Sequence, residues 1–220
     1  MPDRTRARQL ARESISQGDP LGWFERLYQE AREGKSEVPW ADLRPNPHLL
    51  DFWKLHPRPA VGKTALAIGS GFGDDAEQLA AWGFRTTAFD ISETAVRATR
   101  ERFPASPVNY VTADLLAPPP DWFGSFDFVF EAYTLQVLPE NLRPAAIEKI
   151  AAFVRPGGLL LVIARGREEN DPPGEMPWPL TREELRRFTK AGLREVAIED
   201  FVDPEDPGVR RFRALYSRKS

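Results

Sequence analysis

Short apolar segments recur along the chain from Lys63 onward, and amphipathic stretches separate them. The strand-like segments span residues 64–68, 85–90, 108–112, 126–131 and 159–164. The stretches with helical periodicity span residues 75–82, 93–103, 143–153 and 182–191. This alternation is typical of a mainly parallel sheet whose crossover helices cover both faces. We therefore expect an α/β domain built on a Rossmann-like sheet.

The last part of the chain departs from this alternation. Residues 193–201 and 209–217 are both strand-like, and only a short segment containing the turn sequence DPEDPG joins them. A connection of this length is too short for a parallel crossover. We expect an antiparallel hairpin that completes a seven-stranded, mostly parallel sheet.

The residues before Lys63 have a different character. Residues 4–16, 20–33 and 48–55 have helical periodicity, and the proline-rich stretch VPWADLRPNPH separates the second helix from the third. We expect residues 1–62 to form a helical cap across the open end of the sheet, in the same domain as the core at residues 63–220. A length of 220 residues suits a single domain.

Composition removes several classes of function. The chain has no cysteine, which excludes disulfide frameworks, thiolate zinc sites and cysteine nucleophiles. Its formal net charge of −3 argues against a nucleic-acid partner. No segment resembles a signal peptide or a membrane span, and the two histidines have no acidic cluster beside them that would suit a metal. We expect a cytoplasmic protein, monomeric or a small homo-oligomer, that acts on a small molecule.

A glycine-rich segment, IGSGFGDD, follows the first predicted strand and leads into a helix. Gly69 and Gly71 allow a tight turn and a close approach of a ligand to the backbone. A dinucleotide fingerprint has its third glycine where Asp74 stands, and Asp74 and Asp75 would put carboxylates beside a pyrophosphate. S-adenosylmethionine has no phosphate and carries an ammonium and a sulfonium. The segment therefore favours this cofactor over the NAD of an oxidoreductase.

Acidic residues close the next two predicted strands. Asp90 stands where α/β nucleoside sites place a carboxylate for the ribose hydroxyls, and we assign its neighbour Ile91 to the same site. Asp114 is a candidate acceptor for the amine of adenine. The alternatives are a helix cap at Asp90 and a turn at Asp114, although Ser92 is the better cap residue.

The ordered motifs IGSGFG, AFDIS, TADLL, FDFVFEAYTLQVLP and VRPGGLLLVI resemble those of class I S-adenosylmethionine-dependent methyltransferases. The stretches VPWADLRPNPHLL and YTLQVLPENLRPAAIEKIAAFVRPGGLLLVIARG are similar to the group of thiopurine, halide/thiol and tellurite-resistance methyltransferases. The resemblance implies a methyltransferase that uses S-adenosyl-L-methionine, releases S-adenosyl-L-homocysteine and methylates a small molecule.

The resemblance also implies a set of cofactor contacts. These are Trp40 over the methionine part, Gly69, Ser70 and Gly71 in the turn, Asp90 at the ribose, Asp114 and Leu115 at the adenine, and Glu131 after the fourth strand. Two departures from the group are visible. Ala67 and Ile68 stand where the wider superfamily has an acid, which leaves the ammonium to Glu131 or to backbone carbonyls. Leu43 stands where the relatives have a glycine.

The chemistry of the acceptor decides whether a base is needed. A thiolate or halide needs little proton handling, whereas a hydroxyl or amine requires a general base. Glu131 and Tyr133 are the candidate catalytic bases, Arg165 is a candidate for holding an anionic acceptor, and no histidine is expected near the motif loops. We expect a thiol in preference to a hydroxyl. A small-molecule O-methyltransferase and a non-catalytic domain that binds S-adenosylmethionine remain the alternatives.

Overall fold

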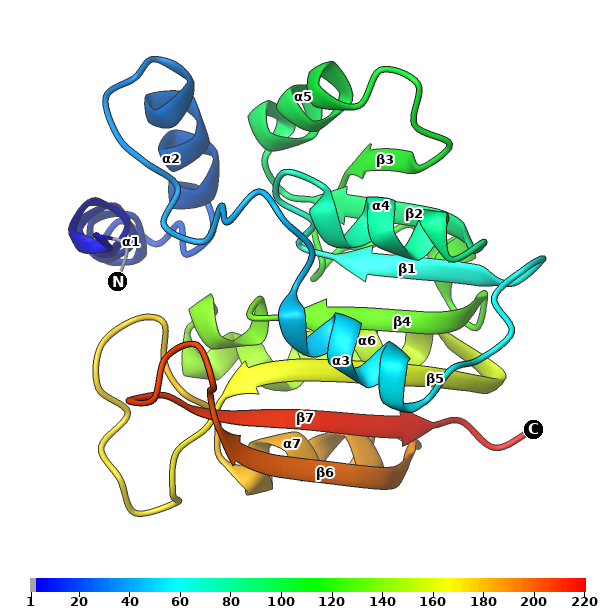
Figure 1. The fold of residues 1–220 in the computed structure, drawn as a ribbon. Coiled ribbons are helices and arrows are strands. Elements are labelled where there is room, and N and C mark those ends of the chain that lie inside the picture. The colour runs from blue at the N-terminus through cyan, green and yellow to red at the C-terminus, as the bar shows by residue number, and fades with distance from the viewer. Residues whose placement is uncertain (1–2) are drawn as a thin grey trace.

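Seven strands form one sheet in the order β3-β2-β1-β4-β5-β7-β6 within residues 3–220, the part of the chain that the computed structural model describes (Figure 1). The strands are β1 (Thr64–Ile68), β2 (Arg85–Asp90), β3 (Asn109–Thr112), β4 (Phe126–Ala132), β5 (Val154–Arg165), β6 (Arg194–Val202) and β7 (Arg210–Ser217). The first five are parallel, and β7 runs antiparallel to both β5 and β6. The predicted seven-stranded, mostly parallel Rossmann-like sheet with its C-terminal antiparallel hairpin is confirmed.

Helices cover both faces of this sheet. They are α1 (Thr5–Ser16), α2 (Trp23–Arg32), α3 (Pro47–Leu55), α4 (Asp74–Ala81), α5 (Glu93–Arg102), α6 (Arg143–Phe153) and α7 (Arg182–Lys190), with short 3-10 turns η1 (Pro120–Trp122), η2 (Leu135–Val137) and η3 (Glu140–Leu142). Within residues 3–220, no helix is long and apolar enough to cross a membrane.

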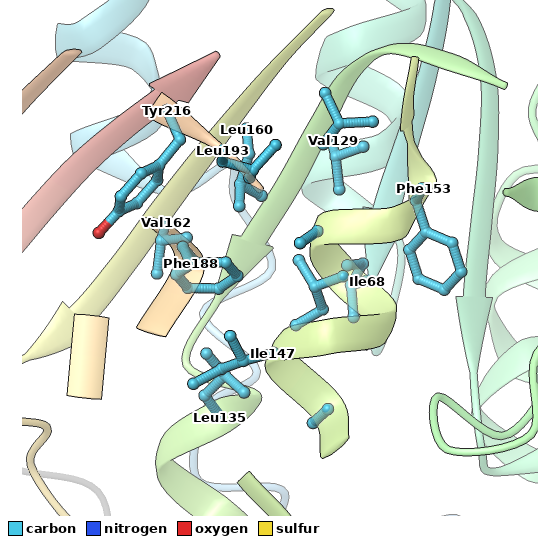
Figure 2. Close-up of a cluster of buried hydrophobic side chains, with 14 of the residues drawn as sticks. Ile68, Val129, Leu135, Ile147, Phe153, Leu160, Val162, Phe188, Leu193 and Tyr216 are labelled. Atoms are coloured by element: carbon cyan, nitrogen blue, oxygen red, sulfur yellow. The ribbon is translucent and has the colours of Figure 1, made fainter. Parts of the chain in front are cut away.

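Each face of the sheet has its own apolar core. Leu66 and Ile68 of β1 pack with α6 and α7 on one face, where Ile147 and Phe188 lie in the same cluster (Figure 2). Ala65 and Ala67 of the same strand face the other core. Successive side chains of a strand point to opposite faces, so the continuous apolar run TALAI fits a strand that is covered on both sides.

Helix α3 departs from the expected cap. Its buried side chains Leu49 and Phe52 belong to the core cluster of Ala65 and Ala67, on the face that α4 and α5 also cover. Trp53 stacks on Trp82 with ring centroids 4.3 Å apart. The apolar side of α3 is thus buried on the sheet face. Of the three helices before β1, α1 and α2 are the two that lie beyond the carboxyl ends of the parallel strands (Figure 1).

The carboxylate of Glu25 is the main polar link between helix α2 and the start of α5, beside an exposed ion pair of Arg32 with Glu101 and packing of Tyr28 on Ala95. The Oε2 atom of Glu25 accepts hydrogen bonds from Ser92 Oγ at 2.6 Å and from Thr94 N at 3.2 Å, and its Oε1 accepts from Thr94 Oγ1 at 2.6 Å. Ser92 and Thr94 lie at the start of α5. The cap helices are therefore anchored beside the end of β2, where the glycine turn and Asp90 also lie.

Candidate functional site

A cavity of about 530 Å³ lies at the carboxyl edge of the parallel strands. Its wall combines the ends of β1, β2 and β4 with residues of α1 and α2, the loop at residues 39–46 and the turn between β6 and β7. Cavities of this size are typical of small-molecule sites, and the carboxyl edge is where open α/β sheets bind ligands.

The glycine turn presents bare backbone to this cavity. Gly69 and Gly71 have φ angles of 60° and 52°, in the left-handed region that glycine tolerates. A Cβ at Gly69 would lie 2.3 Å from Thr134 Oγ1, and one at Gly71 would lie 3.1 Å from the Tyr28 hydroxyl. Ser70 lies between them, and its buried Oγ has no hydrogen-bond partner within residues 3–220. The turn therefore needs glycine both for its backbone conformation and for the close packing of Thr134 and Tyr28.

Asp90 ends β2 and is only 6% exposed. Its Oδ2 accepts a hydrogen bond from Gly71 N at 2.9 Å, and its Oδ1 accepts one from Ser92 N at 3.0 Å. Burial raises the pKa of this carboxyl, while the backbone donors act in the opposite direction. Ser92 is the cap of α5, with its Oγ accepting from Ala95 N, as the sequence predicted. Asp90 thus braces the glycine turn, a role that the sequence did not reveal, and lines the cavity at the same time.

The other predicted cofactor residues line the same cavity. They are Trp40, Gly69, Ser70, Gly71, Ile91, Asp114 and Leu115. Asp114 forms a local turn, because its Oδ1 accepts from Leu116 N at 2.8 Å, and its Oδ2 has no partner among residues 3–220. The indole Nε1 of Trp40 donates to the Tyr28 hydroxyl at 3.0 Å. Folding therefore gathers these residues around one space, although the role of each stays a prediction.

Glu131 is placed differently from the rest. It is fully buried and, among residues 3–220, it is not part of the cavity wall. Its Oε1 accepts from Thr134 N at 2.7 Å and Leu135 N at 3.0 Å, and its buried Oε2 has no partner in the described chain. Burial raises the pKa of this carboxyl to about 7. The side chain turns back to hold the start of η2, which separates it from the ligand space.

Tyr133 does line the cavity, in an unusual backbone conformation. Its φ of 66° is rare for a residue with a bulky side chain and is a mark of functional sites. The guanidinium of Arg211 lies 4.9 Å from its ring centroid. Burial raises the pKa of the phenol, so Tyr133 stays protonated at neutral pH and suits binding or orientation better than proton removal.

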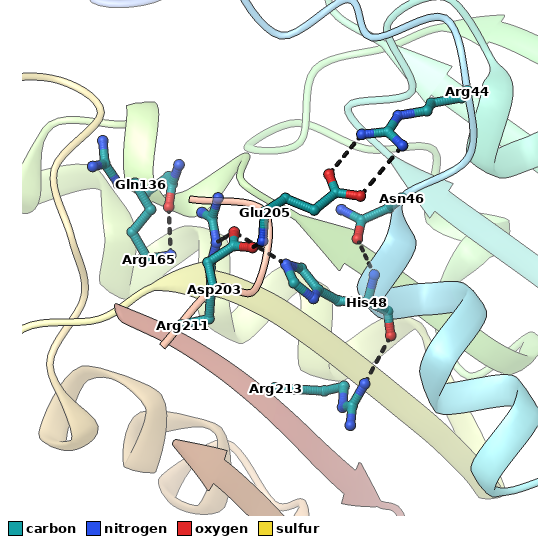
Figure 3. A network of polar contacts seen from close by, with 9 residues as sticks. All are labelled: Arg44, Asn46, His48, Gln136, Arg165, Asp203, Glu205, Arg211 and Arg213. Atoms are coloured by element: carbon teal, nitrogen blue, oxygen red, sulfur yellow. Dashed lines mark hydrogen bonds and ion pairs between the residues drawn. The ribbon is translucent and has the colours of Figure 1, made fainter. Parts of the chain in front are cut away.

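The expectation that no histidine lies near the motif loops is wrong. His48, in the first turn of α3, lines the cavity and is 3% exposed. Its Nε2 lies 3.4 Å from Asp203 Oδ2, and Arg211 Nε donates to the same oxygen at 2.7 Å (Figure 3). Burial lowers the pKa of the imidazole, which keeps it neutral at pH 7. The sequence indicates the helix start at Asn46-Pro47, but it does not indicate that His48 contacts Asp203 on the distant β6–β7 turn.

Comparisons with known proteins agree with this geometry. Residues 65–158 match the family described as a methyltransferase domain. A thiopurine S-methyltransferase of Vibrio cholerae serotype O1 is 25% identical over 175 residues, which cover 72% of this chain and 78% of the relative. Thiocyanate methyltransferase 1 of Brassica oleracea is 26% identical over 173 residues, covering 74% and 72%. The chain is an S-adenosylmethionine-dependent methyltransferase, similar to the class I enzymes.

The fold of this methyltransferase also occurs in solved structures. The 1,6-didemethyltoxoflavin-N1-methyltransferase of Burkholderia thailandensis, solved with 1,6-didemethyltoxoflavin and S-adenosylhomocysteine, has a TM-score of 0.66 at 20% identity. The alignment covers 90% of this chain and 86% of that one. The similarity thus extends over the cap as well as the sheet.

The methyltransferase cavity suits S-adenosylmethionine by its chemistry. Asp90 and Asp114 offer carboxylate oxygens to hydroxyl or amine donors, and the face of Trp40 suits a sulfonium. Asp74 and Asp75 also line the cavity at the start of α4, where a dinucleotide would need its pyrophosphate. Arg102 pairs with Asp74 at 2.7 Å, so the free acceptors of this wall are mainly those of Asp75, Asp90 and Asp114, which fit a cationic cofactor better than a diphosphate.

The departure at Leu43 has a structural counterpart. Leu43 has a φ of 51° and is 57% exposed in the loop beside the cavity. A glycine adopts this conformation without strain, whereas leucine does not. The loop therefore keeps the shape that a glycine would favour, and the substitution adds an exposed apolar side chain at the mouth of the cavity.

Proposed function

We propose that this methyltransferase methylates a small-molecule thiol within the cavity at the carboxyl edge of the sheet. When bound, S-adenosylmethionine supplies an electrophilic methyl group on its sulfonium. The observation that supports the proposal is the buried, neutral imidazole of His48 beside the Asp203 carboxylate, in the wall of the same cavity as the glycine turn and Asp90. The names of the relatives, a thiopurine S-methyltransferase and a thiocyanate methyltransferase, support sulfur chemistry.

In this proposal His48 is the general base. In the proposed tautomer Nε2–H donates to Asp203 and Nδ1 is unprotonated, and no hydrogen bond to Nδ1 occurs within residues 3–220. The acceptor gives its S–H proton to Nδ1, its sulfur forms a bond to the methyl carbon, and the bond from that carbon to the sulfonium breaks to leave S-adenosylhomocysteine. A thiol, with an ordinary pKa of about 8.5, loses its proton to imidazole far more readily than an alcohol does.

Glu131 has a positioning role instead of a chemical one. It holds the turn that follows β4 through Thr134 N and Leu135 N, and Tyr133 lies within that turn. Tyr133 faces the cavity and contacts Arg211, so it is placed to orient the acceptor. The proposal therefore keeps Tyr133 at the acceptor and moves proton transfer to His48.

The test is release of S-adenosylhomocysteine with benzyl mercaptan and benzyl alcohol as matched acceptors. We expect turnover with the thiol, and we expect His48→Gln to lower kcat by about 10²- to 10⁴-fold at pH 7. The loss should shrink as the pH rises through the pKa of the thiol, because the thiolate then forms without a base. His56→Gln, which changes the other, exposed histidine, is the matched control.

Three results would contradict the proposal. A preference for the alcohol would make the enzyme an O-methyltransferase. An equal loss at every pH would show that His48 is structural. Tight binding of S-adenosylhomocysteine without turnover of any thiol, alcohol or halide would favour a non-catalytic binding domain.

A further inference from the structure

Two guanidinium groups in the cavity wall have no polar partner among residues 3–220. Arg4 precedes α1 and Arg165 ends β5, and both line the cavity while being partly buried. Neither side chain forms a hydrogen bond or an ion pair with any residue of the described part, 3–220. Other arginines of the same wall are paired, Arg44 with Glu205 and Arg211 with Asp203. An unpaired, partly buried guanidinium has donors available for a ligand.

The positive charge of Arg4 disfavours the charged form of Arg165. Burial, followed by the positive charges of Arg4 and Arg211, lowers the pKa of Arg165. Burial, with Arg8 and Arg211 nearby, lowers the pKa of Arg4 in the same way. Asp206 partly offsets this field at both groups without forming a salt bridge to either. Gathered like charges of this kind are relieved when an anion lies between them.

The position of Arg165 points to the acceptor end of the cavity. Its backbone N donates to the buried side chain of Gln136 at 2.8 Å, which fixes the end of β5. The side chain of Arg165 lies beside the polar network in which Asp203 contacts both Arg211 and His48 (Figure 3). The acids Asp90 and Asp114 belong to the ends of β2 and β3 instead, on the other side of β1.

We propose that Arg4 and Arg165 form an oxyanion subsite that binds a carboxylate, sulfonate or phosphate group of the methyl acceptor. The substrate class is then a small thiol that also carries an anionic group. A guanidinium fork binds such groups through paired, charge-assisted hydrogen bonds. The inference rests on the proposed function, because it assigns this cavity to the acceptor.

The experiment measures binding without turnover. Calorimetry on enzyme saturated with S-adenosylhomocysteine compares 4-mercaptobenzoate with 4-mercaptobenzyl alcohol, which have similar shape and differ in charge. We expect the anion to bind at least about 10-fold more tightly to the wild type, as charge-assisted hydrogen bonds allow. Arg165→Gln and Arg4→Gln should each remove most of this preference. Arg97→Gln, on the exposed side of α5, removes the same charge outside the cavity and should leave the preference unchanged.

Several outcomes would overturn the subsite. Equal affinity of the wild type for the two probes would show that no anion is recognised. An unchanged preference in both variants, with a raised Kd for S-adenosylhomocysteine, would assign the arginines to the carboxylate of the cofactor. Arg165→Lys retains the charge and should keep part of the preference, so it serves where Arg165→Gln folds poorly. If the enzyme does not methylate thiols but still binds the anionic probe more tightly, the proposed reaction is wrong and the anion subsite is supported.

Discussion

Asp90 joins a structural and a proposed binding role in one carboxylate. Its oxygens hold Gly71 N and Ser92 N and also border the cavity. We expect Asp90→Ala to weaken binding of S-adenosylhomocysteine by about 2–4 kcal/mol, through the loss of charge-assisted bonds to the ribose. We also expect the free energy of unfolding to fall by about 1–3 kcal/mol, because two backbone donors lose their acceptor.

Calorimetry and urea unfolding measure the two effects of the Asp90 substitution separately. Asp90→Asn retains an acceptor oxygen and the shape of the side chain, so it should recover part of the stability while binding remains weak. An unchanged Kd in a folded Asp90→Ala protein would remove this residue from the cofactor site.

At the scale of elements, the attachment of α2 to α5 controls the cap. Glu25 accepts hydrogen bonds from Ser92 and Thr94, and α2 contributes Phe24 and Tyr28 to the cavity wall. We expect Glu25→Gln to lower the local opening free energy of α2 by about 2 kcal/mol, which is roughly a 30-fold faster amide exchange, because a neutral amide replaces a charged acceptor.

Hydrogen exchange with and without S-adenosylhomocysteine tests this attachment. In the wild type, we expect the cofactor product to slow exchange in α2 and to leave the second half of α3, around Phe52, unaffected, since that part packs on the sheet face away from the cavity. Glu148→Gln, an exposed residue of α6, is the control for the charge change. Protection that is equal in the free and bound protein across α2 would argue against a cap that closes over the cofactor.

For the whole molecule, the buried carboxyl groups make stability depend on pH. Burial raises the pKa of Glu131 to about 7 and that of Asp75 to about 6. A carboxyl whose pKa is higher in the folded state stabilises that state at low pH and loses this contribution as the pH rises through its folded pKa. We therefore expect Glu131→Gln to gain up to about 3 kcal/mol in unfolding free energy, relative to wild type, between pH 5 and pH 8.

Urea unfolding of both proteins across this pH range measures the difference. The amide of glutamine can still accept from Thr134 N and Leu135 N, so the turn after β4 should persist. His48 has the opposite dependence, because its lowered pKa favours the folded state at higher pH. It is common to both proteins and cancels in the comparison. A constant difference from pH 5 to pH 8 would show that Glu131 does not titrate in this range.

Local sequence information was sufficient for most of the sheet. Strands β1 and β2 and helix α6 have the predicted bounds, because apolar runs that end in glycine or aspartate, or that repeat with helical period, carry their own signal. The glycine turn and the acids that follow the strands are local features too. Parallel strands bring their carboxyl ends to one edge of the sheet, so residues as distant as Gly69, Asp90 and Asp114 were predicted to meet, and all three line one cavity.

The chain order by itself therefore determined the sheet, its connecting helices and the edge proposed to bind the cofactor, since each depends on periodicity and short-range turns. Tertiary structure alone decided the proposed acceptor side. The antiparallel return of β7 brings Asp203 and Arg211 to His48, and no periodic signal connects residues so far apart. Packing likewise drew α3 onto the sheet face and turned Glu131 away from the cavity wall toward its own loop. The positions of α3 and Glu131 depend on burial and on hydrogen bonding, which are properties of the folded state.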